Sequence, residues 1–296
     1  TMFIVVILAV FIMIVPQNLY YTISAKDFIT YMGVGRCDLR MDLQQIDRMG
    51  EKVADIAACL EADSAVSEFA VLTTKTFGVR LEDGTTENSK VELGDHAVFP
   101  VACVSGRMPL AEQEISLSVL CAEEWEKEVG DELTLLTADG EKTLTVCGIY
   151  SDITNGGKTA KAVFSDDSTK AVWSTVCISL KDSNQLDSKK VEYGSRFPFA
   201  KISGIEDYIA QTFGQTLRSV RTASLVSVLV AAAITLLVTL LFLKMLVAKD
   251  RYSIAVTKAM GFTDTDVKKQ YLWRAVTVLA AGIVCGTVLA GTLGEK

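Results

Sequence analysis

Three apolar stretches dominate the hydrophobic pattern of this chain. Residues 1–25, 222–243 and 275–293 contain no charged side chain. A helix that crosses the hydrocarbon core of a bilayer needs about 20 apolar residues, and runs of this length are rarely buried in soluble cores. We therefore predict three spanning helices, over residues 1–25, 218–247 and 272–293.

The first stretch has two interpretations. It is apolar only from Met2 to Val15 and turns polar at Gln17. A secretory signal peptide would need a basic start and a small-residue cleavage site, but no Lys or Arg precedes Lys26. We favour a spanning helix that is truncated at its start and continues outward as a helical stalk to about residue 33.

Between the first two spans, residues 34–217 show the mixed periodicities of an α+β domain, large enough to bury its own core. Met49, Val53, Ile56 and Leu60 have the spacing of a helix packed on a sheet. Strands are predicted over 37–43, 67–81, 97–104, 114–120, 132–136, 142–150 and 173–180, with a hairpin turn at Asp139–Gly140. Short helices are predicted over 122–129 and from 204 to about 221. The polar segments 151–168 and 181–195 are predicted to be exposed loops or lids.

Charge separates as sharply as hydropathy. Residues 1–217 carry 19 Lys and Arg against 32 Asp and Glu, whereas residues 218–296 carry 10 against 4. Seven of those ten basic residues lie between the second and third apolar stretches, and short basic loops stay in the cytoplasm. We therefore predict a cytoplasmic turn over 248–271 and an extracellular domain over about 26–217, in a multi-pass protein of the bacterial cell membrane. A basic cluster between two spans does not indicate nucleic-acid binding.

The predicted turn begins with a short amphipathic helix over 250–260. Gly261 follows it and suits the left-handed geometry common at helix ends. Thr263, three residues before Asp266, has the spacing of an N-terminal cap for a second helix, which runs through Tyr271, Trp273 and Arg274 into the membrane.

The third span carries Gly282, Gly286 and Ala290 at four-residue spacing. Small residues at this spacing form a ridge on which another helix packs closely. We predict a helix-packing face here.

The segment Ala248-Lys-Asp-Arg-Tyr-Ser-Ile-Ala-Val-Thr-Lys-Ala-Met-Gly-Phe-Thr263 resembles the cytoplasmic segment of FtsX-like ABC transporter permeases. Ser253 stands where that family usually has Glu, and Met260 replaces a common Leu. A weaker resemblance, to the MacB-type periplasmic core, lies in Gly106-Arg107-Met108-Pro109, Glu114-Ile115 and Gly130-Asp131.

The resemblance implies a permease subunit that couples a separate cytoplasmic ABC ATPase to the outer domain, for export of an amphiphilic, peptide or lipoprotein substrate or for transmission of force. It implies a second permease half, or a homodimer partner, in the same bilayer. The ATPase-coupling residues it implies are Arg251, Tyr252, Ser253, Ile254, Ala255, Lys258, Ala259, Met260 and Gly261.

No motif for chemistry appears in the chain. Gly140-Glu-Lys-Thr143 has only the tail of a phosphate-binding loop, so ATP hydrolysis is expected in the partner. One histidine, His96, and seven cysteines without a CxxC pair do not indicate a metal site, and most cysteines are predicted to be small buried residues. We predict no catalytic residue, no cofactor and no metal. The acidic run at 123–128 and Asp166–Asp167 are interpreted as solvated surface.

Two other functions fit the same pattern. A membrane regulator of cell-wall hydrolases would share this topology. A transmembrane sensor would continue into a signalling domain after its second span, whereas this chain turns back into a third. The odd number of spans predicts that the natural protein begins before Thr1 with a basic amphipathic segment and continues beyond Lys296 with at least one more span.

Overall fold

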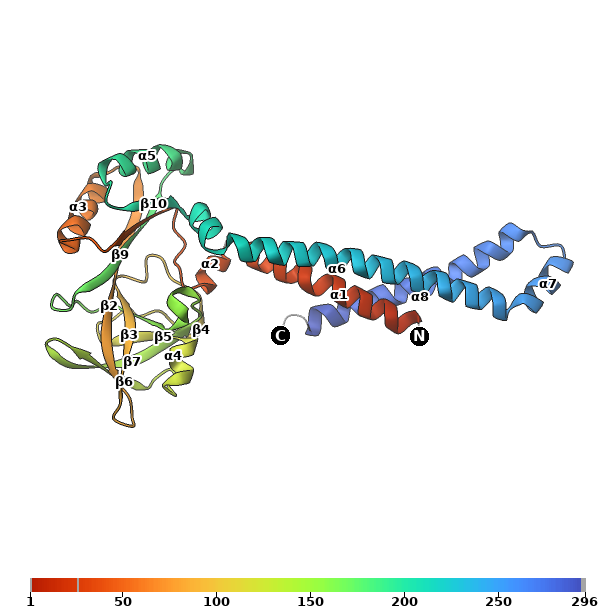
Figure 1. Cartoon of the computed structure of the whole chain (residues 1–296), viewed down its shortest axis with the longest axis horizontal. Helices are drawn as coiled ribbons and strands as arrows, with labels where there is room; N and C mark the ends of the chain where they lie inside the picture. The colour runs from red at the N-terminus through yellow and green to blue at the C-terminus, as the bar shows by residue number, and fades with distance from the viewer. Residues whose placement is uncertain (1, 26, 294–296) are drawn as a thin grey trace. The chain divides into compact units, whose positions relative to one another are not determined.

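The structure is a computed structural model, and it describes residues 2–25 and 27–293. These fall into two compact units, one formed by residues 2–25 with 213–293 and the other by residues 27–212 (Figure 1). We call them the membrane unit and the mixed domain.

The membrane unit consists of four helices. They are α1 (Met2–Ser24), most of α6 (Ile205–Lys249), α7 (Arg251–Ala259) and α8 (Asp264–Leu293). Of these, α1, α6 and α8 are long and apolar enough to cross a membrane. The helix predicted from residue 204 continues without a break through the second apolar stretch.

The predicted stalk is not one continuous helix. α1 ends at Ser24, and a separate short helix, α2, runs over Phe28–Tyr31. Thr30 explains the break, because its N–H and its hydroxyl both donate to the Asp27 carbonyl, at 3.1 and 2.7 Å, and so begin a new turn. The first basic residue, Lys26, lies outside the described residues.

The mixed domain is built on one sheet of ten strands. The strands are β1 (Leu39–Gln44), β2 (Val66–Arg80), β3 (Thr86–Leu93), β4 (Cys103–Gly106), β5 (Glu114–Ser118), β6 (Glu132–Thr137), β7 (Gly140–Tyr150), β8 (Thr159–Ala162), β9 (Ala171–Leu180) and β10 (Lys201–Gly204). Their order is β10-β1-β9-β2-β3-β8-β5-β7-β4, and β6 pairs with both β2 and β7.

That last pairing closes six strands into a barrel. The ring runs β2-β3-β8-β5-β7-β6 and returns to β2, whose last residues pair with β6. Its interior is a continuous apolar core, in which Phe77 and Phe164 meet edge to face with ring centroids 5.8 Å apart. Closure gives each of these six strands a partner on both sides, and the sheet edges lie at β10 and β4.

β10, β1 and β9 join the first part of β2 in an open sheet covered by two helices, whereas β4 pairs with β7. α3 (Met49–Ala62) and α5 (Leu186–Arg196) contribute to the core of β1, β9 and β2. Ile56 and Leu60 are fully buried and Val53 is half-buried, as the helical spacing predicts. The α+β class is therefore confirmed.

Four details of the domain differ from the sequence prediction. The 151–168 segment is not a loop throughout, because it contains β8, which pairs with β3 and β5. The 181–195 segment contains α5, and its polar residues form the outer face of that helix. Of the strand predicted over 97–104 only the end is extended, in β4, while β3 was missed. The helix predicted over 122–129 is instead α4 (Val119–Glu124), which starts earlier because the Ser118 hydroxyl accepts from the Cys121 N–H at 3.3 Å.

β8 was missed for a physical reason. All four of its residues are buried, but the run Thr-Ala-Lys-Ala contains a lysine and no large apolar side chain, so it does not have the composition expected of a buried strand. Lys161 is among them, and its ammonium donates to the Glu92 carboxylate. His96 joins the same cluster, with Nε2 3.0 Å from the Glu92 carbonyl oxygen. Burial, with a further contribution from Lys161, lowers the pKa of His96 to about 4.

The residues of the weaker, MacB-type motif stabilise the strands around β7 through hydrogen bonds and a close backbone approach. Arg107 donates two hydrogen bonds to Glu114, at 2.8 and 2.5 Å. Gly106 has φ +69°, and a Cβ there would lie 2.3 Å from the Cys147 carbonyl oxygen. Gly130 donates to the Val146 carbonyl at 2.8 Å. Residues far apart in sequence thus hold β4, β5 and β7 together.

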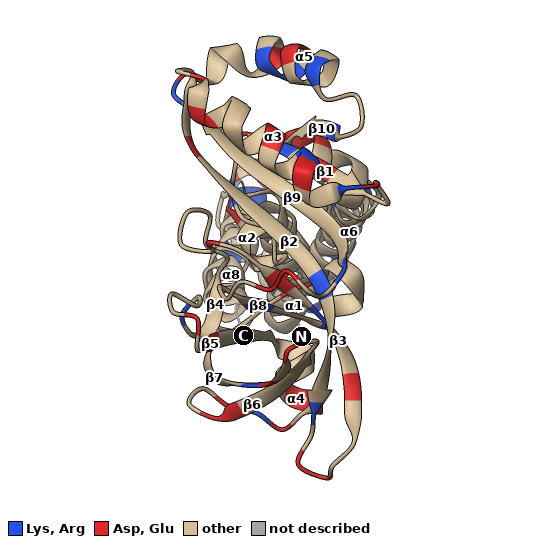
Figure 2. Cartoon of the chain, turned by 90° about the vertical axis from the view of Figure 1, so that its left-hand side faces the viewer, with Lys and Arg blue, Asp and Glu red and all other residues tan. Residues whose placement is uncertain are grey.

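Acidic side chains are prominent in the loops and hairpins of the domain (Figure 2). The seven cysteines are free, and Cys37, Cys59, Cys121 and Cys177 are buried, as predicted for most of them. Among the described residues, no group of three or more His, Cys, Asp or Glu is arranged to hold a metal ion.

Candidate functional site: the basic turn between α6 and α8

The turn between α6 and α8 is built around α7, a helix with no buried residue. Tyr252 and Met260, which share one face, are 81% and 74% exposed. Phe262, just beyond the helix, is 54% exposed. Large apolar side chains this exposed on an amphipathic helix mark a surface that contacts something else. We call Tyr252, Val256, Met260 and Phe262 the apolar ridge of α7.

The structure places the predicted coupling residues together on this helix. Ile254 is half-buried, and the other eight are exposed. Those eight are Arg251, Tyr252, Ser253, Ala255, Lys258, Ala259, Met260 and Gly261. The apolar ridge is thus flanked by cations.

Both predicted features of the turn are present. Gly261 has φ +95°, and its N–H donates to the Lys258 carbonyl at 3.0 Å, which ends α7. Thr263 and Asp266 cap α8 reciprocally. The Thr263 N–H donates to the Asp266 carboxylate at 3.1 Å, and the Asp266 N–H donates to the Thr263 hydroxyl at 3.3 Å.

Two contacts that close the turn are not predicted by the sequence pattern. Lys258 forms an ion pair with Asp264 at the start of α8. Asp250, between α6 and α7, accepts a hydrogen bond from the Tyr271 hydroxyl at 3.0 Å. The local signal was the single acid in the run Lys249-Asp250-Arg251. Its partner on α8, 21 residues later, could not be identified without the fold.

The small residues of α8 face α1 within the membrane unit. A Cβ at Gly282 would lie 2.7 Å from Val6 Cγ1, and one at Gly286 would lie 2.8 Å from Val10 Cβ. Ala290, one turn further, is fully buried. The two helix backbones therefore approach as closely as glycine allows at these points.

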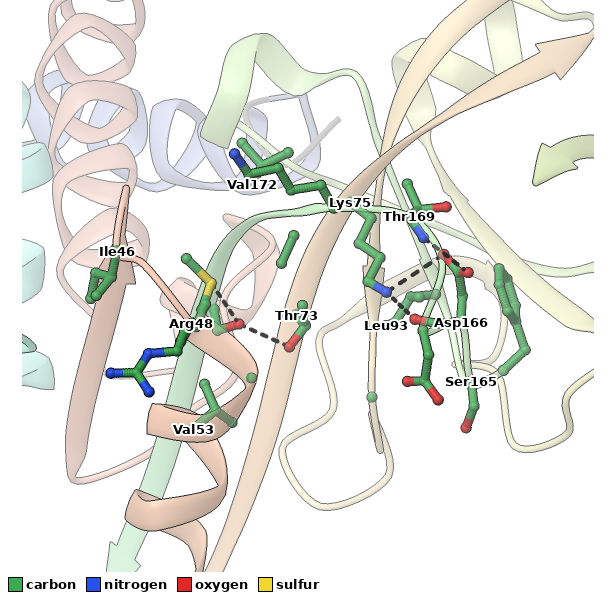
Figure 3. A pocket seen from close by; sticks show the side chains of 18 of the residues that line it. Ile46, Arg48, Val53, Thr73, Lys75, Leu93, Ser165, Asp166, Thr169 and Val172 are labelled. Carbon is green, nitrogen blue, oxygen red and sulfur yellow. Dashed lines mark hydrogen bonds and ion pairs between the residues drawn. The ribbon is translucent and has the colours of Figure 1, made fainter. Parts of the chain in front are cut away.

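The mixed domain contains a second candidate site, a cleft of about 1070 Å³ (Figure 3). It lies beside Thr73 to Lys75 of β2, the residues that pair with both β9 and β3. Ile46, Met49 and Val53 line one wall, and Leu93 and the 163–170 segment line the other. Ligand pockets have volumes of this order and are mainly apolar with a few polar groups.

Two polar pairs lie in this cleft. The Thr73 and Ser174 hydroxyls are 2.9 Å apart, and the Lys75 ammonium lies 3.5 Å from Asp166 Oδ2. Burial acts to raise the pKa of Asp166, but hydrogen bonds from Ser168 and Thr169 outweigh it and hold that pKa well below its usual value. The cleft can therefore accept a ligand with an apolar part and a polar or charged part.

Three helices are long and apolar enough to cross a bilayer, and an exposed basic turn lies between two of them, as in a membrane protein. Residues 225–295 match the family described as FtsX-like permease C-terminal. This match covers α7, α8 and most of the apolar stretch of α6, and it confirms the resemblance seen in the sequence.

Solved structures resemble the mixed domain. The periplasmic region of MacB from Actinobacillus actinomycetemcomitans is 16% identical, with a TM-score of 0.42, over 64% of this chain and 98% of that one. The extracellular domain of the ABC-type transporter YknZ from Gram-positive bacteria is 11% identical, with a TM-score of 0.38, over 52% of this chain and 89% of that one. No curated protein sequence matches the chain.

Proposed function

We propose that the chain is the permease subunit of an ABC transporter, in which α7 couples a separate cytoplasmic ATPase to the mixed domain outside the membrane. The substrate class is amphiphilic: a peptide, a lipoprotein or a similar molecule that is exported or acted on by transmitted force. The match to the FtsX-like permease family supports the class of protein, and the surface of α7 supports the coupling role.

The observation that carries the proposal is the apolar ridge of α7 with its flanking cations. A short helix between two apolar spans has no packing reason to expose Tyr252 and Met260 unless a partner covers them. Lys and Arg concentrated in a short loop keep that loop in the cytoplasm, where an ATPase would be found. The same charge rule gives the mixed domain its outside location.

The other parts of the chain are consistent with this function. Only 6% of the apolar window of α6 is buried within the chain, which leaves surface for lipid and for a second permease half or a homodimer partner. The cleft beside Lys75 is the part of the mixed domain best suited to an amphiphilic ligand.

The coupling role is tested by the double variant Tyr252→Asp with Met260→Asp, co-expressed and purified with a candidate ABC ATPase from the same organism. Large exposed side chains at the centre of an interface carry most of its binding energy. We expect ATPase co-purification to fall at least about tenfold, and ATP turnover to return to that of the free ATPase.

Val191→Asp is the matched control, because Val191 is 71% exposed on α5 in the mixed domain. It should co-purify with the ATPase at the wild-type level. Retention of the ATPase by the α7 variant would contradict the coupling role.

The topology has its own test, an epitope inserted after Gly84 in the exposed hairpin between β2 and β3. The epitope should bind antibody on intact cells, whereas one inserted after Gly261 should bind only after permeabilisation. The reverse pattern would overturn the assigned orientation.

The alternative with the same topology is a regulator of cell-wall hydrolases. No contact among the described residues bears directly on that role. ATP-dependent release of peptidoglycan fragments by cells, without movement of a peptide or lipoprotein, would favour it over the transporter.

A further inference from the structure

Asp250 occupies the junction of α6 and α7 and is the one acidic residue among the cations from Lys244 to Lys258. Its backbone departs from helical geometry, with φ −93° and ψ 15°, so the chain bends there. The Asp250 N–H still donates to the Leu246 carbonyl at 2.9 Å, and its own carbonyl accepts from the Ile254 N–H at 2.9 Å. The backbone hydrogen bonds on both sides of Asp250 are therefore kept, but residue 250 lacks the regular helical dihedral angles that would fix the angle between α6 and α7.

The Asp250 side chain reaches across to α8. Oδ2 accepts from the Tyr271 hydroxyl at 3.0 Å and lies 3.5 Å from Nη1 of Arg274. Tyr271 and Arg274 are one turn apart on α8, and the Arg274 guanidinium lies 5.4 Å from the centre of the Tyr271 ring. Three side chains thus join the α6–α7 junction to α8.

Tyr271 is fixed within this group by burial. It is only 7% exposed, and it continues a buried stripe at four-residue spacing with Val267 and Ala275. A buried phenol normally has a partner for its hydroxyl, and here that partner is a carboxylate, which makes the hydrogen bond charge-assisted. Arg274 is half-exposed and contributes less, because exposed ion pairs are weak.

The opposite end of α7 is closed as well. Lys258 pairs with Asp264, and the reciprocal Thr263–Asp266 cap fixes the start of α8. α7 is therefore tied to α8 near both of its ends, while its apolar ridge stays free. These contacts therefore fix the orientation of α7 relative to α8 and leave one face of α7 exposed.

We propose that Asp250, Tyr271 and Arg274 form a clasp that makes α6, α7 and α8 move together when α7 is displaced. The proposal rests on the coupling function proposed above and assigns these three as positioning residues, which do not touch the ATPase. With the clasp open, α7 would swing about the bend at Asp250 and the ATPase would move α7 without moving the spans. The chain would then still bind the ATPase, but the movement of the ATPase would no longer be transmitted to the spans.

Two single variants open the clasp with the smallest possible change. Tyr271→Phe removes one hydroxyl, and Asp250→Asn removes the charge but keeps the shape. In the full complex with the ATPase we expect wild-type co-purification. We expect the coupling ratio, the amount of a fluorescent lipopeptide probe moved per ATP hydrolysed, to be lowered by roughly three- to tenfold in each variant. The double variant should lose less than the sum of the two single losses, since Tyr271→Phe removes the hydrogen bond that Asp250→Asn weakens.

Tyr21→Phe is the matched control, since Tyr21 on α1 is 70% exposed, and it should couple as wild type. Asp250→Glu keeps the acceptor and should retain more coupling than Asp250→Asn. Wild-type coupling in both single variants, or additive losses in the double variant, would overturn the clasp. Loss of ATPase co-purification in Tyr271→Phe would overturn it too, because the residue would then act in binding. A different result would overturn the proposed function itself: unchanged co-purification of the ATPase with the Tyr252→Asp, Met260→Asp double variant.

Discussion

The membrane unit and the mixed domain differ in where their apolar side chains face. In the apolar windows of α1 and α8 only 22% of residues are buried within the chain, and in α6 only 6%. In the mixed domain, the barrel core is almost completely buried. Lipid accepts apolar side chains as readily as a protein core does, so helices in a bilayer gain little from hiding them from one another and associate through close packing instead.

The same difference applies to polar groups. Charged groups buried in the mixed domain have polar partners, such as Glu92 for Lys161 and the Thr154 and Thr159 hydroxyls for Asp152. The membrane unit holds its ion pairs at the turn, where Lys258 pairs with Asp264 and Arg274 with Asp250. Which of the two units a substitution disturbs more therefore depends on whether the substitution affects burial, close packing or charge.

The largest effect is expected from Gly106→Ala in the mixed domain. Its φ of +69° disfavours any Cβ, and the added atom would lie 2.3 Å from the Cys147 carbonyl oxygen. Strain and overpacking together should cost roughly 3 kcal/mol. Hydrogen exchange of the β4 and β7 amides in the full chain would measure it.

Gly194→Ala is the control for that change, because nothing lies within 4 Å of a Cβ there and Gly194 is in α5. It should be neutral or slightly stabilising. Equal protection of β7 in the two variants would show that the close approach at Gly106 is unimportant.

A smaller effect is expected from Gly286→Leu in the membrane unit. The side chain would push Val10 and separate α1 from α8, at a cost of about 1 to 3 kcal/mol. Thermal unfolding of the full chain in detergent, followed by circular dichroism, would detect the loss. Gly291→Leu, where the space is open, should leave the midpoint unchanged, and equal shifts in both variants would argue against this packing contact.

The smallest effect is expected from acid. The Lys189 ammonium, at 2.6 Å, together with the Ala65 N–H and the Tyr193 hydroxyl, lowers the pKa of Asp63 to about 2. Arg107, with the Leu110 N–H, lowers that of Glu114 to about 2.

Both folded-state pKa values are depressed, so their stabilisation is present above the unfolded values near 4 and is lost as the pH falls toward 2. Each carboxylate should contribute about 1 kcal/mol. Urea midpoints for the mixed domain between pH 5 and 2 would measure the loss, and Asp63→Asn should remove part of the dependence. A pH-independent midpoint would contradict the role of both pairs.

Sequence prediction worked best where a local pattern decided the structure. The turn between α6 and α8 needed only Gly261 to end one helix and Thr263 with Asp266 to start the next, and both contacts lie within a few residues. The small-residue ridge on α8 was equally visible. The clasp was not, because Asp250 and Tyr271 meet only once α6 and α8 turn back on each other.

In the mixed domain the errors follow the same rule. α5 looked like a loop because it is polar, and its place is set by packing on the open sheet. β8 looked like a loop because it contains a lysine and no large apolar side chain, and it is a strand because β3 and β5 pair with it on both sides. The cleft beside Lys75 brings together residues from 45 to 174, which no linear motif connects.

By itself, the sequence determined three apolar helices, the α+β class and the turn that carries α7, because span length, periodicity and helix caps are local properties of the chain. Tertiary structure alone decided the closure of the barrel, the support of β7 by Arg107 and Glu114, and the partner of Asp250. Those features depend on contacts between residues distant in sequence, whose energies exist only after the chain has folded.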